Sequence, residues 1–175
     1  MPIDEQGAFK PVNIALLTIS DSRTAADDTS GDTLAARIAE AGHILKAREI
    51  SRDDANTITA HLHRWIDDEE IDVVITTGGT GVTGRDVTPE VLERVGDKAI
   101  PGFGELFRYL SYATIGTSTI QSRACAVVAR GTYIFALPGS IGAVKDGWDQ
   151  ILVHQLDSRH RPCNFVELMP RLRER

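Results

Sequence analysis

The segment from Ile71 to Glu90, reading IDVVITTGGTGVTGRDVTPE, constrains the fold of this chain more than any other. It begins with an apolar run typical of a buried strand and continues into a loop with four glycines in seven residues, Gly78 to Gly84. Thr88 is a favourable helix N-cap, and Pro89 suits the first helical position. The segment therefore predicts a strand, a glycine loop and a helix. Such a loop exposes backbone N–H groups and accepts positive φ, which suits a phosphate ligand.

The glycine pattern Gly79-x-Gly81-x-x-Gly84 also matches the dinucleotide fingerprint, so an NAD-binding oxidoreductase is a weaker alternative. In that fingerprint the helix opens within the motif, in the first βα unit, and an acid follows about 20 residues later. Here the predicted helix begins only at Thr88, two earlier βα units precede the loop, and a predicted helix occupies the position of that acid. A P-loop is excluded because no Gly-Lys-Ser/Thr follows. A plain flexible turn would not need the Arg85-Asp86 pair.

Composition bounds the class of protein. The chain has 175 residues, 42% of them hydrophobic and 25% charged, which is ordinary for one globular domain. No apolar run approaches the roughly 18 residues of a membrane span, and the first residues do not follow the plan of a signal peptide. Two cysteines and a net charge of −6 predict a cytoplasmic protein that binds neither nucleic acid nor membrane. We expect a flexible tail over residues 1–11, a domain over 12–165 and a C-terminal tail over 166–175.

Strands and helices are predicted to alternate along the chain. Strand-like segments cover Val12–Ile19, Ile44–Ile50, the run before Gly78, and Thr132–Leu137, and each is followed by apolar residues at helical spacing. The segment GTSTIQSRACAVVARG, from 116 to 131, is interpreted as a turn and a short helix. Because almost no hairpin signal is present, we expect a three-layer α/β fold with a mainly parallel sheet and helices on both faces.

A parallel sheet gathers the loops that follow its strands at one edge, where ligands bind. These loops begin at Ser20, Ser51, Gly78 and Pro138, and two acids, Asp53 and Asp86, lie just past strand ends. Two neighbouring carboxylates repel each other and would repel a phosphate, and Mg²⁺ resolves both problems. The alternatives are that Asp53 caps its helix and that Asp86 only complements a helix start.

Other reactive residues give weaker patterns. His61 and His63 are two apart on a predicted helix and point to different faces. Cys125 and Cys163 lack metal-ligand spacing, and no serine lies in a Gly-x-Ser-x-Gly elbow. The sequence therefore offers no motif for a protein nucleophile.

Five segments in order, TTGGTGVTGRDVTPE, PGFGELFR, IGTSTIQSRA, FALPGS and RPCNF, resemble the MoaB/MogA family of molybdenum-cofactor biosynthesis proteins. The resemblance covers about Val12 to Phe165. PGFGELFR, IGTSTIQSR and RPCNF are more similar to the MoaB branch than to the MogA branch.

The resemblance implies a molybdopterin-binding domain that, in active members, is an adenylyltransferase. The terminal phosphate of molybdopterin attacks the α-phosphorus of ATP and releases pyrophosphate. The two aspartates of active members correspond to Asp53 and Asp86, as catalytic and Mg²⁺-holding residues. Some MoaB proteins lack the arginine and the DVTPE segment and are expected to be inactive, whereas this chain keeps Gly84 to Glu90, which favours an enzyme. The alternative is a non-catalytic protein that binds and delivers molybdopterin.

The resemblance also implies the substrates, cofactor and partners. Mg²⁺ is the expected cofactor, with ATP and molybdopterin as substrates. A homo-oligomer is expected, a hexamer before a trimer, with apolar residues between Ile100 and Ile120 as interface surface, and a partner protein for molybdenum insertion fits the pathway. The candidate substrate contacts are Ser20, Asp21, Ser22, Ser30, Gly78, Gly79, Thr80, Gly81, Ser118, Gly139 and Ser140.

Overall fold

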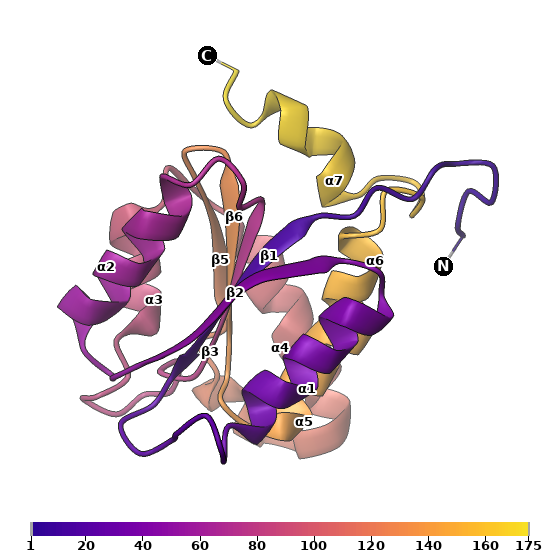
Figure 1. Cartoon of the computed structure of the whole chain (residues 1–175). Helices are drawn as coiled ribbons and strands as arrows, with labels where there is room; N and C mark the ends of the chain where they lie inside the picture. Colours follow the sequence, from indigo (N-terminus) through magenta and orange to yellow (C-terminus); the bar gives the residue numbers. More distant parts are fainter. Residues whose placement is uncertain (1, 175) are drawn as a thin grey trace.

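A six-stranded sheet forms the centre of the molecule in the computed structural model, which describes residues 2–174. The strands lie in the order β2-β1-β3-β6-β5-β4 (Figure 1). Their bounds are β1 Asn13–Ile19, β2 Ile44–Ser51, β3 Val73–Thr77, β4 Lys98–Ala99, β5 Cys125–Ala129 and β6 Thr132–Leu137. β2, β1, β3 and β6 run parallel, while β5 and β4 are antiparallel to their neighbours. The mainly parallel sheet is confirmed.

Helices cover both faces of the sheet, as predicted (Figure 1). One apolar cluster packs one face of the strands against α1, α4 and α5 with its continuation, and the other packs the opposite face against α2 and α3. The helices are α1 Thr29–Glu40, α2 Ala55–Ile66, α3 Thr88–Val95, α4 Pro101–Ile115, α5 Ile141–Gly147, α6 Val153–Gln155 and α7 Phe165–Leu168. A π-helical segment, η2 Trp148–Leu152, joins α5 to α6, and 3₁₀ segments cover η1 Gly116–Gln121 and η3 Met169–Arg171.

The central strands are buried because helices lie on both sides of them. Every residue of β3 and β6 is buried, and so are the last six residues of β1. Continuous apolar runs, rather than alternation, are the expected signature of such strands. The parallel order places the ends of β1, β2, β3 and β6 at one edge of the sheet.

The interpretation of residues 116–131 was wrong in its second half. η1 is a short helix of the 3₁₀ type, but Cys125–Ala129 forms β5, which makes a hairpin with β6. The turn residues Arg130 and Gly131 have φ of 50° and 97°, as a two-residue hairpin with a primed turn requires. Arginine is an unusual residue at positive φ, so the sequence lacked the Asn-Gly signal that marks such hairpins.

The N-terminal segment lies against the segment that follows α6. The amide of Asp4 donates to the carbonyl of Arg159 over 2.8 Å, and the amide of Lys10 donates to the Ser158 hydroxyl over 2.9 Å. Beyond residue 165, α7 buries Val166 against the core. The mobility of residues 1–11 stays a prediction, and residues 1 and 175 lie outside the described part. Within residues 2–174 no helix is both long and apolar enough to cross a bilayer.

Candidate functional site

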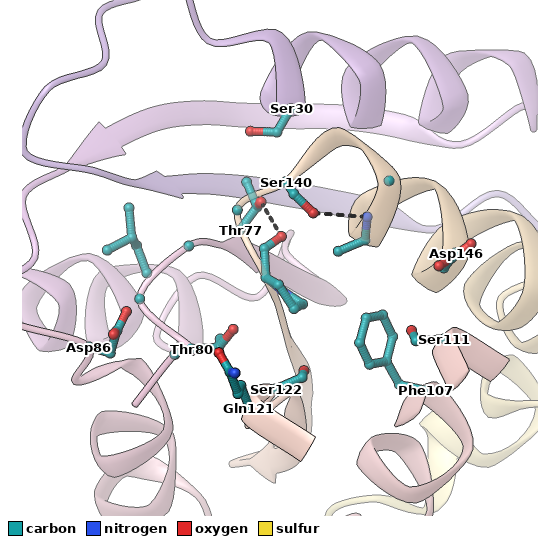
Figure 2. Close-up of a pocket in the computed structure, with 18 of the residues that line it drawn as sticks. Ser30, Thr77, Thr80, Asp86, Phe107, Ser111, Gln121, Ser122, Ser140 and Asp146 are labelled. Carbon is teal, nitrogen blue, oxygen red and sulfur yellow. Dashed lines mark hydrogen bonds between the residues drawn. The ribbon is translucent and has the colours of Figure 1, made fainter. Parts of the chain in front are cut away.

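A cavity of about 580 Å³ lies at the edge of the sheet where the parallel strands end. The ends of β1, β3 and β6 contribute its floor, and α4, α5 and η1 contribute its other walls (Figure 2). Nine predicted site residues line it: Ser20, Ser30, Gly78, Gly79, Thr80, Gly81, Asp86, Gly139 and Ser140. The rule that ligands bind past the ends of parallel strands therefore located the cavity.

Four predicted residues do not line this cavity. Asp53 lies directly behind the glycine loop, Asp21 and Ser22 are exposed on the loop after β1, and Ser118 is exposed on η1. Asp21 remains connected to the site, because its carboxylate accepts from the amide of Asp53 over 3.2 Å and pairs with Arg85. Within residues 2–174, no comparable hydrogen bond or ion pair links Ser118 to the cavity.

The glycine loop requires glycine at its first two positions. Gly78 has φ of +112° and Gly79 has φ of +64°. A side chain on Gly78 would collide with the carbonyl of Ile19, and one on Gly79 would approach the Asp53 carboxylate to 2.7 Å. The loop thus folds tightly over the end of β1 and against Asp53.

Thr88 is the first residue of α3 rather than its N-cap, so the predicted cap was wrong. The cap position is Val87, which provides no side-chain hydrogen bond. The Thr88 hydroxyl instead donates to the carbonyl of Gly78 over 3.1 Å, and its amide donates to the carbonyl of Gly79 over 3.0 Å. Thr88 therefore ties the helix to the glycine loop.

The pKa values of Asp53 and Asp86 are shifted in opposite directions. Burial raises the pKa of Asp53, the negative charges of Asp21 and Asp86 raise it further, and Arg85 partly offsets them. The Thr83 hydroxyl donates to Asp86 over 2.6 Å and holds its pKa below the ordinary value. Asp53 does not cap α2, because the cap is Asp54. The capping alternative for Asp53 is thus excluded.

One oxygen of Asp53 indicates which kind of ligand fits the site. Oδ1 is buried and has no hydrogen-bond partner within the described chain. A buried carboxylate oxygen beside two other acids calls for a cation or a proton. No group of three or more His, Cys, Asp or Glu residues within 2–174 could hold a metal by itself. Two carboxylates together with substrate phosphate oxygens are nevertheless a donor set that Mg²⁺ accepts.

Arg123 fixes the far side of the glycine loop. Its guanidinium donates to the carbonyls of Gly81 over 2.7 Å and Asp86 over 2.8 Å, and it pairs with Glu90. The amide of Arg123 also donates to the carbonyl of Thr80 over 2.9 Å. The backbone around Asp86 is therefore held by a residue that precedes β5, which strand-end reasoning does not reveal.

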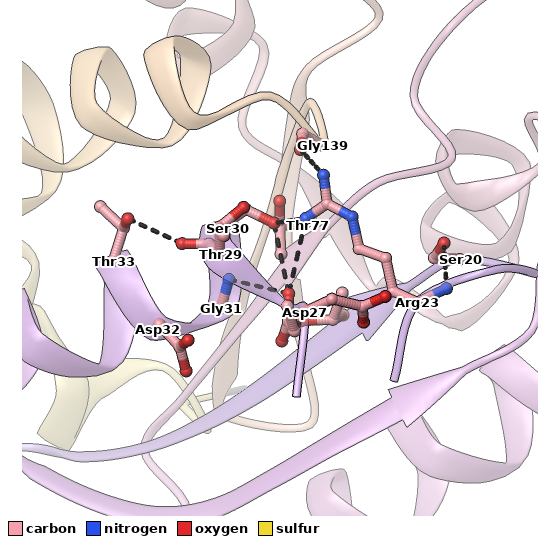
Figure 3. Close-up of polar contacts among 12 residues, drawn as sticks. Ser20, Arg23, Asp27, Thr29, Ser30, Gly31, Asp32, Thr33, Thr77 and Gly139 are labelled. Atoms are coloured by element: carbon pink, nitrogen blue, oxygen red, sulfur yellow. Dashed lines mark hydrogen bonds and ion pairs between the residues drawn. The ribbon is translucent and has the colours of Figure 1, made fainter. Parts of the chain in front are cut away.

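An ion network around the buried Asp28 supports the loop that follows β1, where Figure 3 shows the Arg23 side chain reaching toward Gly139. Asp28 is fully buried, accepts from the Thr18 hydroxyl over 2.7 Å and pairs with Arg48 over 2.9 Å. Arg23 lies 3.6 Å from Asp28, donates to Ser30 and reaches the carbonyl of Gly139 over 3.2 Å. The loops after β1 and β6 are thereby joined across the cavity edge.

Residues 15–158 match the family model described as probable molybdopterin binding domain. The chain is 48% identical to molybdenum cofactor biosynthesis protein B of Escherichia coli K12 over 157 residues, which cover 90% of this chain and 92% of that protein.

The chain belongs to the MoaB/MogA family of molybdenum cofactor biosynthesis proteins.

Solved structures agree with this membership. A crystal structure of molybdenum cofactor biosynthesis protein B superposes with a TM-score of 0.86 at 37% identity, covering 97% of this chain and all of that one. The tungsten cofactor synthesizing protein MoaB from Pyrococcus furiosus superposes with a TM-score of 0.78 at 32% identity, covering 95% and 100%. The resemblance deduced from the five sequence segments is therefore confirmed.

Proposed function

We propose that this protein adenylylates molybdopterin with Mg-ATP. The observation that carries the proposal is the pair of carboxylates Asp53 and Asp86 beside the glycine loop, with one buried oxygen of Asp53 that has no donor within residues 2–174. Membership in a molybdopterin-binding family supplies one substrate class. The intact segment from Arg85 to Glu90 supports catalysis rather than binding alone.

The chain's own groups position the substrates. Residues Gly78 to Gly81 of the glycine loop line the cavity, and backbone N–H groups in loops of this kind suit phosphate oxygens. Asp53 and Asp86 would hold Mg²⁺, which when bound neutralises charge that develops on the triphosphate. Arg85 is exposed, pairs with Asp21 and lowers the pKa of Asp53, so it supplies a further positive charge beside Asp53.

No protein nucleophile is required. An oxygen of the molybdopterin phosphate forms the new bond to the α-phosphorus of ATP, and the bond to pyrophosphate breaks. Such reactions depend on positioning and charge neutralisation. Burial raises the pKa of the Cys125 thiol to about 11, so this cysteine is not a competing nucleophile.

The test is product formation by the full chain. Incubation with molybdopterin, ATP and Mg²⁺ should release pyrophosphate and yield adenylylated molybdopterin, detected by mass spectrometry, and a chelator should stop both. ATP turnover without the pterin would contradict the assigned acceptor.

A second candidate is molybdopterin binding and delivery without catalysis. The flanking segments PGFGELFR and RPCNF, which are MoaB-like, favour it. This candidate predicts pterin binding with no pyrophosphate at any Mg²⁺ concentration, so the same assay separates the two functions.

A further inference from the structure

Arg123 contacts the glycine loop from outside the cavity. It lies between η1 and β5 and lines a separate hollow of about 440 Å³, together with Val82, Thr83 and Asp86. Asp86 lines both this hollow and the cavity, whereas Arg123 does not line the cavity. Arg123 can therefore act on a ligand in the cavity only through the loop.

The three nitrogens of the Arg123 guanidinium bind three different acceptors. Nε donates to the carbonyl of Gly81 over 2.7 Å, Nη2 donates to the carbonyl of Asp86 over 2.8 Å, and Nη1 pairs with the carboxylate of Glu90 on α3. A guanidinium is planar and holds its donors in a rigid fork. This fork fixes the Asp86 backbone relative to both the start of the loop and the first turn of α3.

The backbone of Arg123 is itself held in place. On α4, Nη1 of Arg108 donates to the carbonyls of Ser122 over 3.4 Å and Ala124 over 3.2 Å, on either side of Arg123. The amide of Arg123 also donates to the carbonyl of Thr80 over 2.9 Å. The guanidinium therefore extends from a fixed segment.

The loop needs such a contact because its middle is open to solvent. Residues 82–85 are exposed, and a side-chain carbon on Gly84 would meet no atom within 4 Å. The amide and hydroxyl of Thr83 donate to Oδ2 of Asp86 over 2.9 and 2.6 Å, but Thr83 belongs to the same exposed segment. These two bonds orient the carboxylate within the loop and do not fix its distance from Asp53.

We propose that Arg123 is a positioning residue that holds Asp86 near Asp53 for a divalent cation, and that it acts through the shape of its guanidinium rather than through its charge. The cation rests on the proposed function, whereas the contacts of Arg123 are those of the structure. Partners that orient the ligands of a metal typically change metal affinity 10- to 100-fold when they are removed.

Charge and position predict opposite effects of removing Arg123. A positive charge close to a cation site repels the cation, and Arg123→Ala also leaves the carboxylate of Glu90 without this partner. On charge alone, Arg123→Ala should therefore strengthen cation binding, and Arg123→Lys should leave it unchanged. If Arg123 positions Asp86, both variants should weaken binding, because the single amine of lysine cannot replace the fork.

Titration of the full chain with Mn²⁺, followed by the electron paramagnetic resonance signal of the free ion, tests the proposal without ATP or molybdopterin. Mn²⁺ accepts the same oxygen ligands as Mg²⁺. Arg123→Ala should weaken Mn²⁺ binding roughly 10- to 100-fold, and Arg123→Lys at least about fivefold. Arg94→Ala is the control, because Arg94 is exposed on α3 and within residues 2–174 has no hydrogen bond or ion pair to the loop. It should change the affinity by no more than about twofold.

A double-mutant cycle shows whether Arg123 acts through Asp86. In the Asp86→Asn background, Arg123→Ala should change Mn²⁺ affinity by no more than about twofold, because the group that Arg123 positions is no longer a carboxylate. An equal loss in both backgrounds would mean that Arg123→Ala disturbs the protein generally, and would overturn the proposal.

Tighter Mn²⁺ binding by folded Arg123→Ala, full affinity in Arg123→Lys, or no Mn²⁺ binding by the unmodified chain would each overturn the proposal. Circular dichroism checks the fold, and Arg123→Lys carries the test if Arg123→Ala does not fold. Coupling between Arg123 and Asp86 in Mn²⁺ binding would support the inference even if the pyrophosphate assay failed. Pyrophosphate release without this coupling would overturn the inference alone, so the two proposals can fail separately.

Discussion

At the scale of single residues, Asp53 lowers the stability of the fold but is needed for the proposed chemistry. Its raised pKa means that the folded state disfavours the ionised carboxylate, so the residue destabilises the fold above its ordinary pKa of 3.8. This cost is relieved as the pH falls through the raised folded-state pKa. A bound cation would relieve it at neutral pH, which is the state that the proposed reaction uses.

Asp53→Asn should therefore stabilise the metal-free protein. We expect about 1 kcal/mol at neutral pH after allowance for solvent screening, or a rise of roughly 2–4 °C in Tm. Thermal unfolding in the presence of a chelator measures the change. Asp54→Asn is the matched control, because asparagine also caps α2 and should change little. A lower Tm for Asp53→Asn would contradict the assigned strain.

The pKa shift of Asp28 has the opposite sign to that of Asp53. Burial raises its pKa, but hydrogen bonds from Thr18 and Arg48 outweigh burial and hold the pKa below its ordinary value. Its stabilising contribution is present above the ordinary pKa of 3.8 and is lost as the pH falls through the lowered folded-state pKa.

Asp28→Asn should destabilise the protein by about 3 kcal/mol at neutral pH, because it leaves Arg23 and Arg48 without their shared buried partner. Urea unfolding at neutral pH and at a pH well below 3.8 measures the effect. The difference from the unmodified protein should shrink at the acidic pH. An equal difference at both values would show that the charge of Asp28 is not what stabilises the rim.

At the scale of elements, the shape of the glycine loop depends on glycine where the backbone has positive φ, and not at every glycine of the loop. Gly78→Ala places a methyl group against the Ile19 carbonyl at φ of +112° and should cost roughly 2–4 kcal/mol. Gly84→Ala meets no atom within 4 Å and should change stability by no more than about 0.5 kcal/mol. Urea unfolding of the two variants compares them directly. Similar losses would mean that the loop is rigid along its whole length.

The strand-end part of the site was predictable because it follows from topology. Apolar runs identify the parallel strands in the sequence, and this places the loops at Ser20, Gly78 and Gly139 at one edge of the sheet. Asp53 was likewise placed at this edge by its position after β2. Strands that pair in parallel end at the same edge of a sheet, so the residues that follow them lie at that edge.

The helix-borne part could not be predicted, because it depends on how helices pack. Phe107 lies buried on α4, and its ring also forms a cavity wall. Ser111 and Asp146 carry no local signal, since neither follows a strand. Arg123 was hidden in the segment whose strand was missed, because the hairpin turn at Arg130 lacks the usual residues.

At the scale of the whole molecule, α4 and η1 expose several large apolar side chains. Tyr109, Tyr112, Ile115 and Ile120 are 77%, 59%, 51% and 82% exposed. Exposed apolar groups concentrated on one helix and its extension are typical of an association surface. They support the expected homo-oligomer, with a hexamer before a trimer, which remains a prediction.

Light scattering should therefore give a mass several times the 19.1 kDa of one chain. Ile120→Asp should shift the protein to smaller species, because it buries a charge in the association surface. Ile44→Asp alters an apolar residue that is 46% exposed on β2, at the outer edge of the sheet, and should leave the mass unchanged. A monomeric unmodified protein would contradict this prediction.

In the proposed function, Asp86, rather than the glycines beside it, makes this protein an enzyme and not only a binder. Pyrophosphate release by the unmodified chain and by Asp86→Asn, with molybdopterin, ATP and Mg²⁺, tests it most directly. Asparagine can still accept from the Thr83 amide, so the variant should keep its fold, which circular dichroism checks. We expect the rate to fall at least about 100-fold while molybdopterin still binds. A folded Asp86→Asn variant that releases pyrophosphate at the full rate would contradict the account.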